Sequence, residues 1–573
     1  MTFEKLGRYW QTLRQLKPVQ FYGRVWYRLY RPRIKTTVFA QTLCVPKDDW
    51  RRPAARAASM LGSTQFRFLN QTHTLPEQGG WNDAGIEKLW LYNLHYFDDL
   101  NAADAGKRLA WHQALIGRWV LENPPAFGNG WEPYPTSLRI VNWVKWLAGG
   151  NAAATGMLES LALQARWLAK RLEWHLLGNH LFANAKALVF AGLFFEGPQA
   201  AAWLKTGLKV ITRELPEQVL ADGGNFERSP MYHAIFLEDV LDLVNAAMHW
   251  PGLVPDAQVA VWRETAGRML GWLGGMTHPD GEIALFNDAA FGVAPGVAEL
   301  MAYAGWLGIG YGSPGRYAPH DDKSDVLTIP QPVIASEARQ SMPSLLHFQN
   351  SGYVRLESDL AVALLDVAPV GPDYLPGHAH ADTLSFELSV FGQRVLVNGG
   401  TSRYGLGPER LRERGTAAHS TVEVAGQDSS EVWGGFRVAR RAYPFDLQLQ
   451  QEPGHLQVAC SHDGYTRLPG APVHRREWRM DEQSLRVTDT VRGGHHAALA
   501  RYILHPGVQI TADANNTWHL TLPDGQALRI VALSGQAHIE TASYAPEFGK
   551  VLPTQCLVVA LAQGQAVVEW LWS

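Results

Sequence analysis

Residues 377–398 read GHAHADTLSFELSVFGQRVLVN, and they decide the character of the C-terminal half of the chain. Apolar and polar residues alternate on both sides of the tripeptide FGQ, a pattern typical of a β-hairpin. Before the hairpin, His378, His380 and Asp382 alternate with alanines, so an extended backbone points all three side chains to one face. The stretch predicts either a hydrogen-bonded polar row or a functional cluster beside a rigid hairpin.

Short alternating segments continue on both sides of this hairpin. GYVRLES and LAVALLDV precede it, and STVEVAG, LQVACSH, SLRVTDTV, ARYILHP and a final CLVVALAQGQAVVEWLWS follow. Many strands without intervening helices favour antiparallel sheets. We therefore expect an antiparallel β-sandwich over residues 345–573.

The first half of the chain has a different period. From about residue 90 to 313, apolar residues recur at spacings of three and four in a series of helical segments. Serial helices of this kind pack as a layered bundle or close into a toroid. Residues 1–89 are expected to form an N-terminal extension with docking helices, and residues 314–344, rich in chain breakers, a linker. The predicted fold class is α+β multidomain.

Composition restricts the function. The 573 residues are 46% hydrophobic and carry a formal net charge of -3, which gives no overall attraction to nucleic acid. The three cysteines are far apart in sequence and predict neither a disulfide framework nor a cysteine zinc site. The 22 tryptophans suit either sugar stacking or core filling. No organic cofactor is expected.

The N-terminus has no long apolar run and no small-residue cleavage site, so we expect neither a signal peptide nor a membrane span. The cytoplasm is then the default location, and the periplasm stays open. Basic and aromatic residues such as Arg24, Trp26 and Arg28 would suit an interfacial membrane helix or a helix docked on the main body.

Four places in the helical half hold polar residues that a packed bundle does not need. Each has a local explanation, because Asn and Ser cap helices and Tyr hydroxyls tie down loops. Four such places in one domain, with histidines in the next, indicate a polar cleft between the domains. The substrate-binding candidates, including two residues after the hairpin, are Asn93, His95, Glu132, Tyr134, Arg139, Arg228, Tyr404 and Arg414.

Several motifs occur in a specific order. They are GNH at 178–180, ERSPMYH at 227–233, GHAHADTLSFELS from 377, NGGTSRYG at 398–405 and AHSTVEV at 418–424. As a set they resemble the heparinase II/III-like polysaccharide lyases and the oligo-alginate lyases built on the same plan. The resemblance implies an N-terminal α/α toroid, a C-terminal antiparallel β-sandwich and a cleft between them. It also implies β-elimination at C4 of a uronic acid in an acidic polysaccharide or oligosaccharide.

The same resemblance assigns catalytic roles. Asn179 and His378 would neutralise the substrate carboxylate, which stabilises the charge that develops when the C5 proton leaves. Tyr232 would be the acid, and also the base for one substrate stereochemistry, while His180 would be the base for the other. Because a phenol has a pKa of about 10, Tyr232 as a base would need a nearby cation, for which Arg228 is the candidate. The adjacent Asn179 and His180 predict a helix start at the edge of a cleft.

A metal site is a further expectation. The resemblance implies a structural zinc held by the second histidine of the pair, an aspartate after the hairpin and a later histidine. These positions are His380, Asn398 and His419, and asparagine is a poorer zinc ligand than aspartate. A hydrogen-bonded cluster without metal and a ligand role for Asp382 both stay open.

Two rival functions remain. An inverting glycoside hydrolase on an α/α toroid would use two carboxylates, with Glu227, Asp288 and Asp382 as candidates. A non-catalytic carbohydrate-binding protein of an exopolysaccharide pathway would keep the cleft without the reaction. Arginines after the hairpin would either be solvated or bind carboxylates; they are Arg410, Arg412, Arg414, Arg437, Arg440 and Arg441. The uronate polymer, the endo or exo mode and the oligomeric state are left open.

Overall fold

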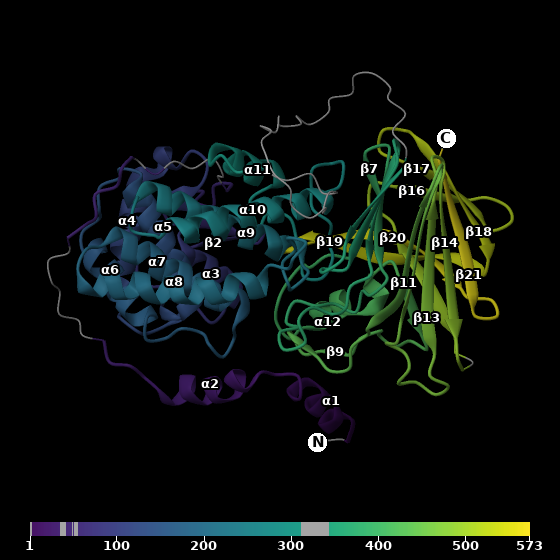
Figure 1. Ribbon diagram of the computed structural model, residues 1–573, viewed down its shortest axis with the longest axis horizontal. Helices are drawn as coiled ribbons and strands as arrows, with labels where there is room; N and C mark the ends of the chain where they lie inside the picture. The colour runs from purple at the N-terminus through teal and green to yellow at the C-terminus, as the bar shows by residue number, and fades with distance from the viewer. Residues whose placement is uncertain are drawn as a thin grey trace.

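The computed structural model describes residues 3–34, 42–48, 50, 56–310, 343–494 and 496–572. A body of helices lies beside a body of strands, and an N-terminal arm runs along the edge of both (Figure 1). This is the predicted combination of an α/α toroid with an antiparallel β-sandwich. The expected linker lies outside the described residues except for its last two positions, and Ser344 already begins a strand.

Helices account for most of the first body. They are α3 (Lys88–Tyr96), α4 (Leu109–Glu122), α5 (Pro133–Ala148), α6 (Met157–Leu168), α7 (Gly178–Phe194), α8 (Pro198–Gln218), α9 (Pro230–His249), α10 (Asp256–Gly275) and α11 (Val297–Trp306). Short 3-10 turns occur at Asp98–Asn101, Ala105–Arg108 and Asn129–Trp131. In the described parts of the chain, no helix is both long and apolar enough to cross a membrane.

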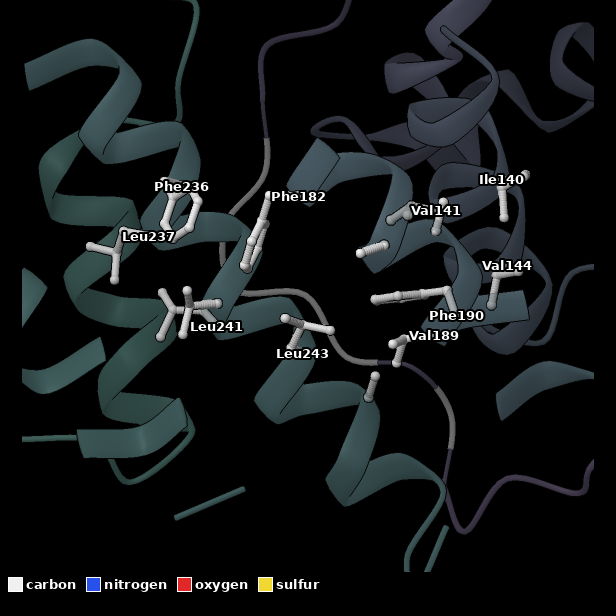
Figure 2. Close-up of a cluster of buried hydrophobic side chains, with 14 of the residues drawn as sticks. Ile140, Val141, Val144, Phe182, Val189, Phe190, Phe236, Leu237, Leu241 and Leu243 are labelled. Atoms are coloured by element: carbon white, nitrogen blue, oxygen red, sulfur yellow. The ribbon is translucent and has the colours of Figure 1, made fainter. Parts of the chain in front are cut away.

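The core of the toroid forms where α5, α7 and α9 meet. Figure 2 shows Val141 of α5, Phe190 of α7 and Leu241 of α9 among the buried side chains of this region. In α7, 15 of the 17 residues are buried, and the two that are not are Asn179 and His180. A helix buried on nearly all sides belongs in the centre of a bundle, so its two accessible residues mark where it reaches a cleft.

The second body contains three antiparallel sheets. The first has the order β3-β4-β5-β6-β7: β3 (Ser344–Phe348), β4 (Tyr353–Glu357), β5 (Ala361–Asp366), β6 (Phe386–Val390) and β7 (Gln393–Leu396). The second has the order β19-β20-β15-β8: β8 (Val422–Val424), β15 (Ala498–Ile503), β19 (Gln536–Glu547) and β20 (Lys550–Ala560). The hairpin predicted from FGQ is β6–β7, with Val390 paired to Gln393.

The third sheet is the largest, with the order β11-β12-β13-β14-β21-β18-β17-β16. Its strands are β11 (Pro444–Glu452), β12 (His455–His462), β13 (Val473–Met480), β14 (Ser484–Arg492), β16 (Gln509–Ala512), β17 (Thr517–Thr521), β18 (Ala527–Ser534) and β21 (Gln565–Trp572). Along the chain between β7 and β11 lie helix α12 (Pro408–Arg414), a 3-10 turn at Thr416–Ala418 and a small hairpin of β9 (Val432–Trp433) and β10 (Arg437–Val438). Ten of the 22 tryptophans are fully buried, which favours core filling as their main role.

The N-terminal extension contributes helices α1 (Phe3–Leu13) and α2 (Pro18–Leu29) and the hairpin β1 (Gln65–Phe68) with β2 (Gln71–Thr74). The tip of this hairpin reaches the sandwich, because the Asn70 amide donates to Glu547 Oε2 and to the Phe548 carbonyl, both at 3.0 Å. The extension therefore bridges the toroid and the sandwich on one side of the space between them.

Candidate active site

Tyr232 lies in the first turn of α9, at the junction of the two bodies. Ser229 caps this helix, because its hydroxyl accepts the Tyr232 N–H at 3.2 Å, and Pro230 fits the first helical position. The Tyr232 hydroxyl lies 2.9 Å from the hydroxyl of Tyr404, which follows β7. Burial, Tyr404 and Asp288 raise the pKa of Tyr232 well above its usual value, so the phenol holds its proton.

His378 packs against Tyr232, with ring centroids 3.9 Å apart. Its Nδ1 lies 2.9 Å from Asp288 Oδ2, and its main-chain carbonyl accepts the Asp288 N–H at 2.9 Å. These contacts fix the ring orientation and leave Nε2 directed toward Glu227, whose Oε2 is 3.6 Å away. The carboxylate of Glu227 also accepts the backbone N–H of Asn179, so it joins the His378 loop to the start of α7.

Asp288 is the centre of a polar group, which we call the Asp288 cluster: the fully buried Asp288, His380 and Arg410, with His378, whose side chain is 14% exposed. The Arg410 guanidinium pairs with both Asp288 oxygens, with Nη2 2.7 Å from Oδ2, and His380 Nε2 lies 2.8 Å from Oδ1. Burial opposes ionisation, but the Arg410 charge and the bonds from both histidines hold the pKa of Asp288 well below its usual range. Asp288 is thus an ionised anchor for His378.

Asn179 and His180 occupy the start of α7, as their sequence predicts. The chain enters this helix through two residues with positive φ, Leu177 and Gly178. A side chain at Gly178 would lie 2.5 Å from Leu375 and 3.3 Å from the Glu227 carboxylate, so glycine lets the helix start approach Glu227. No described residue hydrogen bonds to the Asn179 side chain, which leaves its amide available to a ligand.

His180 lies between an acid and an aromatic ring. Its Nδ1 is 3.2 Å from Glu173 Oε2, and its ring centroid is 4.5 Å from that of Tyr134. Burial disfavours the charged imidazole, but the Glu173 carboxylate outweighs this and raises the pKa of His180. The side chain is 33% exposed, so it can reach a ligand in the cleft.

A cavity of about 500 Å³ extends from Tyr232 into the toroid, and we call it the toroid lumen. Its volume lies within the roughly 300–1,000 Å³ of typical ligand pockets. Residues of the N-terminal extension and of the β19–β20 hairpin line its mouth together with the toroid. Its lining includes Arg56, Asn93, Asp98, Tyr134, Lys145, Lys186, Tyr232, Glu238, Asp239, Asp242 and Tyr404.

Of the described cations that line the lumen, all but the exposed Arg67, which donates to Asn70 Oδ1 at 3.1 Å, are paired with carboxylates. Lys186 Nζ lies 2.6 Å from Asp239 and 2.5 Å from Asp242, and Lys145 also contacts Asp242. Arg56 lies 2.5 Å from Glu238 at the mouth. Among the described lining residues of the inner part, each cation therefore has a carboxylate partner and none is left for an incoming anion.

Three of the predicted substrate-binding residues have structural roles instead. His95 is fully buried, with Nε2 3.0 Å from the Trp81 carbonyl and Nδ1 accepting the Trp119 indole N–H at 3.0 Å. Arg139 is also fully buried and donates to the main-chain carbonyls of His95 and Gly130. Arg414 is buried and donates to the Ala379 carbonyl, so it holds the His378 loop without reaching the cleft.

Arg228 does not point toward Tyr232, for which it was the candidate cation. Arg228 precedes the Ser229 cap with a φ of +59°, and its Nε donates to the Ser351 carbonyl at 2.9 Å. It is therefore turned toward the first sheet and does not assist ionisation of Tyr232. Glu132 pairs with Lys88 at 2.9 Å outside the lumen lining, whereas Asn93, Tyr134 and Tyr404 do line the lumen.

The predicted zinc residues come together, but with an incomplete ligand set. His419 Nδ1 lies 3.3 Å from Asn398 Oδ1, and the rings of His380 and His419 are 5.2 Å apart. Within the described ranges, no group of three His, Cys, Asp or Glu residues could hold a metal ion. Buried atoms without a hydrogen bond are nevertheless present in all three residues: His380 Nδ1, Asn398 Nδ2 and His419 Nε2. Asp382 does not take part, because its Oδ2 accepts the Asn287 N–H.

The hydrolase candidates do not form an accessible acid–base pair. Asp288 is fully buried and saturated by Arg410 and two histidines, and Asp382 is 2% exposed. Sequence reasoning considered Asp288 only for hydrolysis and read Arg410 as one of several loop arginines. No local pattern marks either residue, since their importance arises from a contact across 122 positions of the chain.

An α/α toroid joined to an antiparallel β-sandwich, with a tyrosine–histidine cluster at the junction, defines a class of two-domain toroid–sandwich proteins. Two family descriptions match the sequence: "Heparinase II/III N-terminus" over residues 151–306 and "Heparinase II/III-like, C-terminal" over residues 341–571. The chain belongs to the heparinase II/III-like family.

The chain is also similar to individual known proteins. A heparin-sulfate lyase of Bacteroides stercoris is 27% identical over 350 residues, which cover 58% of this chain and 46% of that protein. The chain thus spans about half the length of this relative. FtsZ-localized protein C of Caulobacter vibrioides is 25% identical, covering 72% of this chain and 66% of that protein. The crystal structure of heparinase III superposes with a TM-score of 0.68 at 16% identity, covering 98% and 93% of the two chains.

Proposed function

We propose that this protein is a polysaccharide lyase that cleaves an acidic, uronate-containing chain by β-elimination. The observation that carries the proposal is the contact between Tyr232 and His378 beside a sugar-sized lumen, with Glu227 linking His378 to the start of α7, where Asn179 and His180 lie. These residues come from two helices and a sandwich loop. They supply an acid, a base candidate and two groups that can contact a carboxylate.

His378 and Asn179 would neutralise the uronate carboxylate. Asp288 holds Nδ1 of His378 at 2.9 Å, so Nε2, on the side of Glu227, is the ring atom that would contact the uronate carboxylate. The Asn179 amide adds a neutral donor from the start of α7. Withdrawing charge from the carboxylate stabilises the carbanion that forms when the C5 proton leaves.

Tyr232 would protonate the glycosidic oxygen as the bond to C4 breaks. Its raised pKa keeps the phenol protonated at neutral pH, which suits a proton donor and opposes a role as the initial base. The Tyr404 hydroxyl at 2.9 Å can hold the phenol in position. His180 is then the group that would take the C5 proton.

A pH prediction tests the role of His180. The base must be neutral, and the pKa of His180 is raised above its usual value, so kcat/KM is expected to rise with pH above about 6.5. Glu173→Gln removes the neighbouring carboxylate charge, lowers the pKa of His180 and should move this rising limb to lower pH by about one unit. Glu159→Gln, on the exposed face of α6, is the matched control and should leave the limb in place. If kcat/KM of Glu173→Gln rises over the same pH range as that of the wild type, His180 is not the base.

The lumen would receive one end of the substrate. The tip of the β1–β2 hairpin contacts residues 547–548 and closes one side of the space between the two bodies. The end of a short chain therefore fits the lumen better than a long polymer that passes through. A sulfate or carboxylate entering the inner lumen would lose its hydration and find no unpaired cation among the described residues. We therefore expect an uncharged end sugar there, with the uronate next to it at His378.

A substrate panel tests the function. Size-defined oligosaccharides and polymers of alginate, hyaluronan, unsulfated glucuronate–N-acetylglucosamine chains and heparan sulfate would be digested and followed by ultraviolet absorbance, which reports the conjugated product. We expect absorbance from an unsulfated oligosaccharide above that from its sulfated counterpart. Binding without any unsaturated product from the whole panel would instead favour a non-catalytic carbohydrate-binding protein.

We further propose a structural zinc ion at His380, Asn398 and His419. His380 and His419 each have one ring nitrogen without a hydrogen bond, which could bind the ion. Asp288, which contacts the other ring nitrogen of His380, is the carboxylate partner that zinc-bound histidines usually have. The Asn398 amide would turn its oxygen to the ion. Zinc would tie the loop after β7 to the loop before β8, and no step of the reaction runs through it.

Elemental analysis tests the zinc site. Purified protein should hold close to one zinc per chain, and His419→Ala should lose both the metal and several degrees of melting temperature because a buried ligand is removed. His455→Ala, at the start of β12, is the control and should retain zinc. A wild-type content below about 0.1 equivalent would leave a hydrogen-bonded cluster as the correct description.

A further inference from the structure

The N-terminal arm carries a charge opposite to that of the rest of the protein. Residues 1–35 contain nine Lys and Arg and one Glu, a net charge of +8. Since the whole chain carries -3, the remaining residues carry -11. The exposed cations of the arm are Lys5, Arg14, Arg24, Arg28, Arg31 and Arg33. A segment of this kind attracts anionic surfaces.

Helix α2 packs on the toroid through its small and polar side. Gln20 is buried and its amide donates to the Tyr374 carbonyl at 3.0 Å, and Gly23 faces His175 so closely that a side chain would lie 3.1 Å from it. The Tyr27 ring is 4.2 Å from His175 and lies under the Arg171 guanidinium. The docked face of α2 is therefore its less apolar face.

The opposite face of α2 is apolar and points to solvent. Tyr22, Val25, Trp26 and Leu29 recur at helical spacing and are 58–76% exposed. In an ordinary surface helix the apolar stripe faces the core. Because this stripe is exposed instead, it marks a surface that contacts another molecule or a membrane.

Helix α1 repeats the arrangement over the sandwich. Its inner side contacts the β9–β10 hairpin, where Thr12 donates to the Val438 carbonyl and Tyr9 packs against Trp433. Its outer side exposes Leu6, Trp10 and Leu13, with Trp10 66% exposed. Figure 1 shows α1 and α2 along the same edge of the molecule, and the two stripes belong to one arm.

We propose that α1 and α2 form a docking surface for an anionic lipid bilayer. The exposed tryptophans and leucines would enter the boundary between headgroups and acyl chains, and the flanking Lys and Arg would meet lipid phosphates. A second copy of the chain is the less suitable occupant. A two-fold contact through this arm would bring two segments of net charge +8 together.

Vesicle sedimentation of the full chain tests the proposal. We expect binding to phosphatidylcholine vesicles that contain about a third phosphatidylglycerol, and at least about tenfold weaker binding to pure phosphatidylcholine or at high salt. The triple variant Trp10→Gln, Trp26→Gln, Leu29→Gln should lose at least about tenfold in binding to the anionic vesicles. All three side chains are exposed, so the fold and the activity on soluble oligosaccharides should be unchanged.

The control replaces exposed apolar residues elsewhere. Leu121→Gln and Leu533→Gln, on α4 and β18, remove side chains that are 86% and 53% exposed and should leave vesicle binding intact. Failure of the wild-type chain to bind anionic vesicles would overturn the proposal. So would a concentration-dependent dimer that the triple variant abolishes, because the arm would then join two copies.

Discussion

Tyr232→Phe is expected to lower the rate of unsaturated product formation by roughly a hundredfold to ten-thousandfold, the usual contribution of a positioned acid. The substitution removes only the hydroxyl that lies 2.9 Å from Tyr404 and faces the lumen. The ring keeps its packing against His378, so the fold and the affinity for oligosaccharide should be retained. Initial rates by ultraviolet absorbance, with melting temperature as the folding check, measure the effect.

The matched control is Tyr443→Phe. The Tyr443 hydroxyl also bonds another side chain, Asp373 at 3.0 Å, but it lies outside the lumen. This variant should keep wild-type activity. A Tyr232→Phe protein that still forms product at close to the wild-type rate would remove Tyr232 from the acid role.

Asp288→Asn is expected to have the largest effect on stability. Arg410 is fully buried, and the substitution leaves its charge without a counter-ion, which costs about 3–5 kcal/mol of unfolding free energy. His378 also loses the carboxylate that orients its ring, so activity should fall together with stability. Urea denaturation monitored by tryptophan fluorescence measures the first effect.

A double variant separates the effect of an unpaired Arg410 charge on stability from the effect of losing Asp288 on activity. Asp288→Asn combined with Arg410→Met removes both buried charges, and we expect it to recover most of the lost unfolding free energy but not the activity. An Asp288→Asn protein as stable as the wild type would contradict the anchoring role of the Asp288 cluster.

The stability difference should depend on pH in a defined direction. The folded pKa of Asp288 is depressed, so its stabilising contribution is present above the unfolded value of about 3.9 and is lost as the pH falls toward the folded pKa. The gap between the wild type and Asp288→Asn should therefore be full at neutral pH and shrink below about pH 4.

The two halves of the fold could be predicted because their periodicities differ. Apolar residues recur every three or four positions in the helical half and alternate with polar residues around FGQ. Both patterns reflect the local backbone geometry, and the helices and the hairpin form where these patterns predict them. The start of α7 at Asn179 was also readable, since a polar pair before an apolar run marks a helix end at a surface. The sequence of the N-terminal arm is compatible with a membrane helix or a docked helix, and the structure shows docking on one face with an exposed apolar stripe on the other.

The site could be predicted only where its residues lie in motifs. Tyr232, which lies in the ERSPMYH motif, contacts His378 and Tyr404 from two other motifs, while His95, Arg139 and Arg414 are buried. A polar residue in a sequence gives no sign of whether it faces a cleft or satisfies buried carbonyls, because this depends on distant segments. Asp288 was undervalued for the same reason, since its partner Arg410 lies on a later helix.

Digestion in heavy-oxygen water distinguishes elimination from hydrolysis most directly. A lyase breaks the bond between C4 and oxygen without adding water, so mass spectrometry of the products should show no heavy oxygen from the solvent and one fragment that lacks a water. A hydrolase would place a heavy oxygen in one of the two fragments and form no double bond. We expect unlabelled, unsaturated product; labelled, saturated product would contradict the mechanism assigned to Tyr232, His180 and His378.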